Sequence, residues 1–172
     1  VRVDGKLLHG KHLQQVRRGL VWVDPEVQLW NRSLRDNLHY GNETLGPVAP
    51  EVLSQADLLE VLTRLPEGDQ TGLGENGNFL SGGEGQRVRL GRGLNRKKPR
   101  LVILDEPFRG LTRVQRRELL TKAREYWQGA TLLFISHDVA DSLDFERLWL
   151  IQDGWLLEDG HPKTLAKQKD SA

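Results

Sequence analysis

Two carboxylates follow an apolar run in the last third of the chain. The stretch "RLVILDEP" spans residues 100–107 and ends its apolar part at Asp105 and Glu106. It is typical of a buried parallel strand, and open α/β sheets bind ligands at the carboxyl ends of their strands. Two acids at such an edge need a counter-charge, which a hydrated Mg²⁺ on a nucleotide would supply. We therefore interpret Asp105 as holding the water shell of the metal. Glu106 would orient, or accept a proton from, a water that attacks the terminal phosphate. The alternative is a strand end that carries solvated acids.

A histidine ends the next apolar run, "ATLLFISHD", at residues 130–138. If both runs are neighbouring parallel strands, His137 shares an edge with Glu106. An imidazole there could contact a terminal phosphate and the attacking water. A histidine at a strand end can equally be a polar terminator without a catalytic role.

The stretch "LSGGEGQR" at residues 80–87 combines a serine with two adjacent glycines. Gly82 and Gly83 would let the backbone approach a ligand closely. Ser81 is a suitable N-cap for the helical pattern that follows. Free N–H groups and the positive dipole end of a helix form an anion site. The alternative is an ordinary serine-capped helix with a flexible entry.

Further along this pattern, Gly91 and Gly93 each cost a helix roughly 1 kcal/mol relative to alanine. We therefore expect close packing to hold this helix.

Periodicity of apolar residues predicts the elements that must position these side chains. Strand, helix and strand in succession, with apolar strands, predict a parallel sheet covered on both faces. We expect a short half-exposed strand and turn at 1–6, and strands at 19–24, 100–107 and 130–138. A hairpin is expected at 147–160, and helices at 33–41, 50–65, 81–95, 114–127 and 139–145.

Composition is that of a globular chain. Hydrophobic residues make up 37% of the 172 positions and charged residues 28%, and the net charge of +1 offers no argument for nucleic-acid binding. The absence of cysteine excludes disulfides and thiol chemistry and suits the cytosol. The chain has no methionine and begins at Val1, so we expect a piece of a longer polypeptide, with N-terminal processing as the alternative.

The order and spacing of these motifs resemble the nucleotide-binding domains of the ATP-binding cassette (ABC) family. The stretch "LSGGEGQR" is similar to the signature motif of that family, "LVILDEP" to its Walker B strand and "ISHD" to its switch histidine. The stretches at 65–83, 33–41 and 147–160 are similar to the loop before the signature in exporter-type members, to their first inserted helix and to their closing hairpin. The resemblance implies an α/β fold with a partial P-loop NTPase-type parallel sheet core and an inserted α-helical subdomain.

The resemblance also implies a division of the chain and a role for each part. Residues 1–32 would begin the α/β core, 33–97 would form the helical subdomain ending in the signature helix, and 98–172 would complete the core. The implied function is ATP binding and hydrolysis that drives transport through nucleotide-dependent dimerisation. ATP and Mg²⁺ are the implied cofactors, and the domain would lie at the cytoplasmic face of a membrane.

Sites in this family are composite, so the resemblance divides the residues between two ATP molecules. Ser81, Gly82, Gly83 and Glu84 would contact ATP held by a second cassette, identical or different. Glu106 and His137 would be catalytic, and Asp105 would hold Mg²⁺ through water. A transmembrane domain is the other implied partner, and nucleic acid is not expected.

The chain departs from the family pattern in its phosphate loop. The motif G-x-x-x-x-G-K-[ST] does not occur in the 172 residues. We therefore expect the chain by itself to bind ATP weakly and to be inactive.

Two further departures concern single positions. Where the family has a glutamine after the strand at 19–24, a gap-free alignment places Pro25, and moving the gap brings Asp24 or Val23. In "EPFRGLT", Thr112 and Arg109 replace an aspartate and a serine of the family. These changes keep open a degenerate, non-catalytic cassette that supplies its signature face to an active partner. A soluble cassette of translation or DNA repair is a third possibility, against which the exporter-like "GLGENG" counts.

Overall fold

The structure is a computed structural model that describes residues 2–3, 5–41 and 46–169. It divides into two compact units, residues 1–135 and residues 136–172, each described by itself. The first unit contains β1 Arg2–Val3, β2 Lys6–Leu7, α1 Gly10–Arg18, β3 Leu20–Val23, α2 Leu34–His39, α3 Pro50–Gln55, α4 Leu59–Arg64, η1 Gly68–Gln70, η2 Glu75–Gly77, α5 Gly82–Leu94, β4 Leu101–Asp105, α6 Arg113–Tyr126 and β5 Thr131–Ile135. The second contains η3 Val139–Ser142, β6 Leu148–Gln152, β7 Trp155–Gly160 and α7 Pro162–Lys169.

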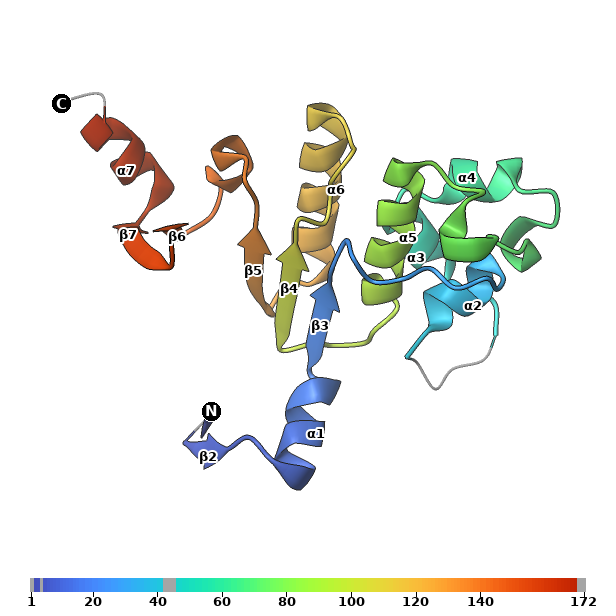
Figure 1. Ribbon diagram of the computed structural model, residues 1–172, viewed down its shortest axis with the longest axis horizontal. Helices are drawn as coiled ribbons and strands as arrows, with labels where there is room; N and C mark the ends of the chain where they lie inside the picture. The colour runs from blue at the N-terminus through green and yellow to red at the C-terminus, as the bar shows by residue number, and fades with distance from the viewer. Residues whose placement is uncertain (1, 4, 42–45, 170–172) are drawn as a thin grey trace. The chain divides into compact units, whose positions relative to one another are not determined.

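A parallel sheet in the order β3-β4-β5 forms the centre of the first unit (Figure 1). In its register Val23 pairs with Leu104, and Leu104 pairs with Phe134. All strands therefore end at the same edge. The α/β fold with a parallel sheet that the sequence predicts is confirmed.

One face of this sheet belongs to the core. Val21, Val23, Val102 and Leu104 alternate along β3 and β4 and are at most 2% exposed. Helix α5 packs on β3 through Gly93, where an added Cβ would lie 2.9 Å from the Val23 Cγ2. The expectation that close packing holds this glycine-containing helix is confirmed.

The opposite face of the sheet differs from expectation. Trp22 and Ile135 lie on that face and are 59% and 42% exposed. The sheet is therefore not covered on both faces within the described residues. An apolar run in the sequence predicts that a strand is buried, but it does not show what covers each face.

The helix expected over 50–65 is two helices, so that expectation is wrong in one respect. Asp57 has φ of +56°, which ends α3 in the left-handed region. The N–H of Leu58 donates to the Leu53 carbonyl at 2.8 Å, and the N–H of Asp57 donates to the Ser54 carbonyl at 3.1 Å. This is a Schellman motif with aspartate in the position that glycine usually takes.

Helices α1 and α7 were not expected from the sequence, and the short helix expected at 139–145 is a 3₁₀ turn, η3. The C-terminal hairpin is confirmed, because β6 and β7 pair antiparallel. Asp153 and Gly154 have φ of +50° and +79°, the signs that the turn of a two-residue hairpin requires.

Candidate nucleotide site

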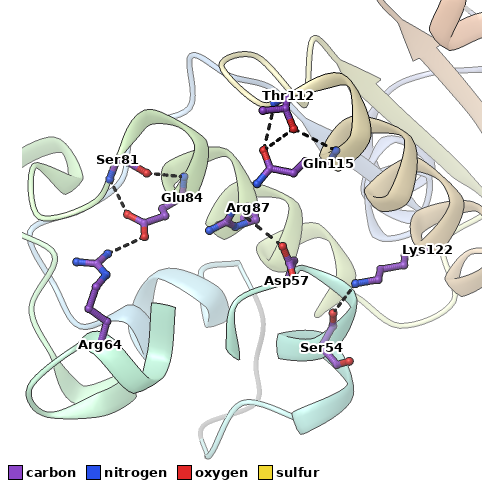
Figure 2. A network of polar contacts seen from close by, with 9 residues as sticks. All are labelled: Ser54, Asp57, Arg64, Ser81, Glu84, Arg87, Thr112, Gln115 and Lys122. Atoms are coloured by element: carbon purple, nitrogen blue, oxygen red, sulfur yellow. Dashed lines mark hydrogen bonds and ion pairs between the residues drawn. The ribbon is translucent and has the colours of Figure 1, made fainter. Parts of the chain in front are cut away.

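The first turn of α5 is fixed by a reciprocal cap. The Ser81 Oγ accepts from the Glu84 N–H at 3.3 Å, and the Glu84 Oε2 accepts from the Ser81 N–H at 2.7 Å (Figure 2). The N–H groups of Gly82 and Gly83 have no acceptor within the described residues. A helix start with N–H donors that have no partner in the chain can accept an anion. The sequence prediction of a serine-capped helix here is confirmed.

Glu84 is held on its other side by Arg64, whose Nη2 donates to the Glu84 Oε1 at 2.7 Å (Figure 2). Burial by itself would raise the pKa of Glu84, but the hydrogen bonds from Ser81 and Arg64 outweigh it and lower the pKa below its ordinary value. The carboxylate is therefore ionised and engaged in the cap. Within the chain, Glu84 therefore shapes the first turn of α5, and its contact with ATP stays a prediction.

Asp105 and Glu106 lie at the carboxyl edge of β4, as predicted. Asp105 pairs with Ile135 of β5, and the Glu106 N–H donates to the Ile135 carbonyl at 3.1 Å. Glu106 has φ of +42°. A glutamate in the left-handed region is uncommon, and such residues concentrate at functional sites. The strand end therefore holds the Glu106 backbone in a specific, strained conformation.

The fit of this edge to Mg²⁺ follows from its donor set. No group of three histidine, aspartate or glutamate side chains that could hold a metal occurs in the part of the chain that the structure describes. Mg²⁺ retains several waters and is commonly bound by one or two carboxylates together with phosphate oxygens. The Asp105 carboxylate fits a metal that is held mainly by water and by a nucleotide.

His137 belongs to the second unit, where it is exposed between Ser136 and Asp138. The Ser136 Oγ accepts from the Asp138 N–H at 3.1 Å, and the Asp138 Oδ1 caps η3 by accepting from the Ala140 N–H at 3.1 Å. These bonds shape the backbone on the C-terminal side of His137. Its proximity to Glu106 stays a prediction.

The loop after β3 makes contacts that the sequence did not indicate. Glu26 forms an ion pair with Arg109 of the loop after β4, at 3.8 Å. The Gln28 Nε2 donates to the Asn76 Oδ1 at 3.0 Å, across 48 positions of sequence. Contacts over such separations leave no local pattern that sequence reasoning could find.

The comparison with known families decides what this arrangement is. The sequence pattern of the ABC transporter family matches residues 1–109, more than half of the chain. The chain belongs to the ABC transporter family. Among ABC proteins it is similar to the ATP-dependent lipid A-core flippase of Alkalilimnicola ehrlichii, 33% identical over 168 residues. The heterocyst differentiation ATP-binding protein HepA of Nostoc is 29% identical over 170 residues.

A solved ABC structure has the same fold. A bacterial Atm1-family ABC exporter with ATP bound matches 89% of this chain with a TM-score of 0.79 and 28% sequence identity. The ABC chain described here is therefore an exporter-type cassette. The match with the Alkalilimnicola protein covers 96% of this chain but only 28% of that protein. The match with the Atm1-family exporter covers 27% of the exporter chain. Within the described residues, none of the helices of this chain has the length and apolar character that crossing a bilayer requires.

Proposed function

We propose that this exporter-type cassette binds and hydrolyses ATP at sites shared with a second cassette, and that hydrolysis drives substrate translocation. The observation that carries the proposal is the placement of Glu106, at the carboxyl edge of β4 with φ of +42°. The division into 1–32, 33–97 and 98–172 remains part of the proposal.

At the signature turn, Ser81, Gly82 and Gly83 would contact the phosphates of an ATP held by the partner cassette. The unused N–H groups of the two glycines would donate to phosphate oxygens. Glu84 would maintain this geometry through the cap. Binding of this kind favours the closed, dimeric state, because the ligand contacts both cassettes only when they meet.

At the carboxyl edge, Glu106 would accept the proton of a water whose oxygen attacks the terminal phosphorus of ATP. The bond from that phosphorus to the bridging oxygen breaks, and ADP and inorganic phosphate leave. His137 would contact the terminal phosphate and orient the water. Mg²⁺, held through water by Asp105, would supply charge neutralisation of the phosphates.

The partners implied by this proposal are a second cassette and a transmembrane domain. The cassette would then lie at the cytoplasmic face of a membrane. The exporter likeness supports this assignment, and no feature of the chain's charge favours nucleic acid.

A non-catalytic cassette is the second candidate function. It is favoured by Thr112, which replaces the family aspartate and serves here as the N-cap of α6. It is also favoured by the loop after β3, where the alignment brings Pro25, Asp24 or Val23 and no glutamine to the position of the family glutamine. Such a chain would supply its signature turn to an active partner and hydrolyse little ATP at its own edge.

The change Glu106→Gln in the intact protein, assayed with its partner, separates the two candidates. We expect ATP turnover to fall by about 10²–10⁴-fold, the usual contribution of a general base, while ATP binding persists. The control is Glu118→Gln on the exposed side of α6, which should leave turnover unchanged. Turnover that survives Glu106→Gln would assign hydrolysis to the partner.

A further inference from the structure

The segment Val27–Trp30, which follows β3, is held by its backbone. The Arg89 Nε of α5 donates to the Val27 carbonyl at 2.7 Å. One turn further along α5, Arg92 donates to the Gln28 carbonyl at 3.4 Å. The helix that begins with the signature turn therefore grips this segment by two consecutive carbonyls.

Asn37 of α2 also holds this segment through hydrogen bonds. Its Oδ1 accepts from the Trp30 N–H at 2.9 Å, and its Nδ2 donates to the Trp30 carbonyl at 3.0 Å. Asn37 is itself fully buried, and Arg92 donates to its Oδ1 at 3.2 Å. The bonds from Asn37 and Arg92 thus belong to one network.

Two glycines make room for the segment. A Cβ on Gly77 would lie 2.9 Å from the Leu29 Cδ1, and one on Gly85 would lie 3.4 Å from the same atom. A Cβ on Gly85 would also lie 3.2 Å from the Arg89 Nη1. Leu29, only 2% exposed, is therefore enclosed between α5 and the loop that precedes it.

Arg89 lies in a partly buried position close to two carboxylates. Burial lowers the pKa of its guanidinium, while the nearby carboxylates of Asp24 and Glu26 oppose that shift. Arg109 forms an ion pair with the same Glu26, and its Nη1 lies 3.8 Å from the Glu26 Oε1. Asp24 directly follows Val23, which pairs with Leu104 of β4. Arg89 therefore reaches from the signature helix to a segment that starts beside the catalytic edge.

We propose that Arg89 is a positioning residue that couples the signature turn of α5 to the segment Val27–Trp30. An ATP phosphate bound at Ser81–Gly83 would displace α5. Because Arg89 is on this helix, it would move the Val27 carbonyl together with the helix. The inference rests on the proposed function, since it requires ATP at the signature turn. It adds a link between α5 and the segment after β3 that runs through the Val27 carbonyl. This link does not require a glutamine in the loop after β3.

Hydrogen exchange of the intact protein with its partner tests this link. In a Glu106→Gln background, Mg²⁺ and ATP should slow exchange in peptides that cover Ser81–Glu84 and in those that cover Val27–Trp30. With Arg89→Ala added, the first response should persist and the second should be reduced, because only the bonds from Arg92 and Asn37 then hold the segment. Arg89→Lys should restore it, because an ammonium group can donate to the Val27 carbonyl. Arg117→Ala, which removes an exposed arginine of α6, should behave as the parent.

Kinetics in the otherwise unchanged protein provide an independent readout. Arg89→Ala should lower kcat for ATP by about fivefold or more, as expected for the loss of a coupling between sites, and leave KM for ATP within about twofold. A merely structural role would lower the melting temperature without this division between kcat and KM. Recovery of kcat in Arg89→Lys guards against a variant that fails to fold.

The outcomes separate the inference from the proposed function. If ATP protects Ser81–Glu84 but Val27–Trp30 responds equally with and without Arg89, or never responds, the inference is wrong and the function stands. If ATP leaves Ser81–Glu84 unchanged in the parent, the signature contact itself is wrong and both proposals are overturned.

Discussion

Gly83 lies so close to Leu111 that a Cβ added to the glycine would be 2.6 Å from the Leu111 Cδ2. The Gly110 carbonyl oxygen would be 3.7 Å away from the same added atom. The first turn of α5 therefore packs directly against the loop that follows Glu106. Any larger residue at this position would force the Leu111 side chain to move, whether or not a ligand also approaches.

Gly83→Ala should consequently destabilise the fold. Leu111 has to shift, and overpacking of this kind typically costs about 1–3 kcal/mol. The matched control is Gly82→Ala, since nothing lies within 4 Å of an added Cβ there. Denaturant unfolding of both variants measures the difference. Equal stability of the two would contradict the close packing of Gly83 on Leu111.

Glu84→Gln should make the free energy of unfolding depend less on pH in the acidic range. The pKa of Glu84 is lower in the folded chain than its ordinary value, so its carboxylate adds stability at neutral pH. That contribution is complete above about pH 4.3, the ordinary pKa of a glutamate, and is lost as the pH falls through the lower folded pKa. The variant should be less stable than the parent at pH 7, and the difference should shrink toward pH 3.

Unfolding midpoints measured across this pH range check the sign. Adding Arg64→Ala to Glu84→Gln should cost less than the sum of the two single changes, because both remove the same ion pair. A difference between parent and Glu84→Gln that stays constant with pH would argue against the shifted pKa.

Gly93→Ala should destabilise the chain although alanine is the better helix former by roughly 1 kcal/mol. The added Cβ would lie 2.9 Å from the Val23 Cγ2 and 3.1 Å from the Val21 Cγ1. Both valines are in the buried sheet face, so neither can move freely, and we expect a net loss of about 1–3 kcal/mol. Thermal or denaturant unfolding provides the measurement, and a gain in stability would show that α5 can move away from β3.

Thr112→Ala should cost about 0.5–2 kcal/mol, because Thr112 caps α6. Its Oγ1 accepts from the Gln115 N–H at 3.4 Å, and the Gln115 Oε1 accepts from the Thr112 N–H at 3.1 Å (Figure 2). Thr112→Asp should retain stability, since aspartate caps helices at least as well. If Thr112→Asp unfolds as easily as Thr112→Ala, the cap is not what Thr112 provides.

Much of the fold could be predicted because its signals are local. The serine and glutamate of the α5 cap are three positions apart, and the apolar run of β4 leads directly to Asp105 and Glu106. The break at Asp57 escaped prediction for a local reason too. Apolar spacing continues across it, and aspartate occupies the left-handed position where a glycine would have marked the helix end.

The contacts between segments could not be predicted in this way. Nothing in the spacing of residues near Gly83 indicates that Leu111 faces it. Likewise, the bond from Arg89 to the Val27 carbonyl joins positions 62 residues apart. Such contacts depend on how helices settle on the sheet, which is a property of packing in three dimensions.

The enclosure of Leu29 between Gly77 and Gly85 has a consequence during synthesis. The segment that contains Leu29 leaves the ribosome well before Arg89, which follows Val27 by 62 positions. At ~5–20 residues per second, that delay is roughly 3–12 s. Until Gly77 and Gly85 have also been made, Leu29 is an apolar side chain without the neighbours that later enclose it, open to a chaperone or to another nascent chain. The order of translation therefore separates the synthesis of Leu29 from that of the glycines that make room for it.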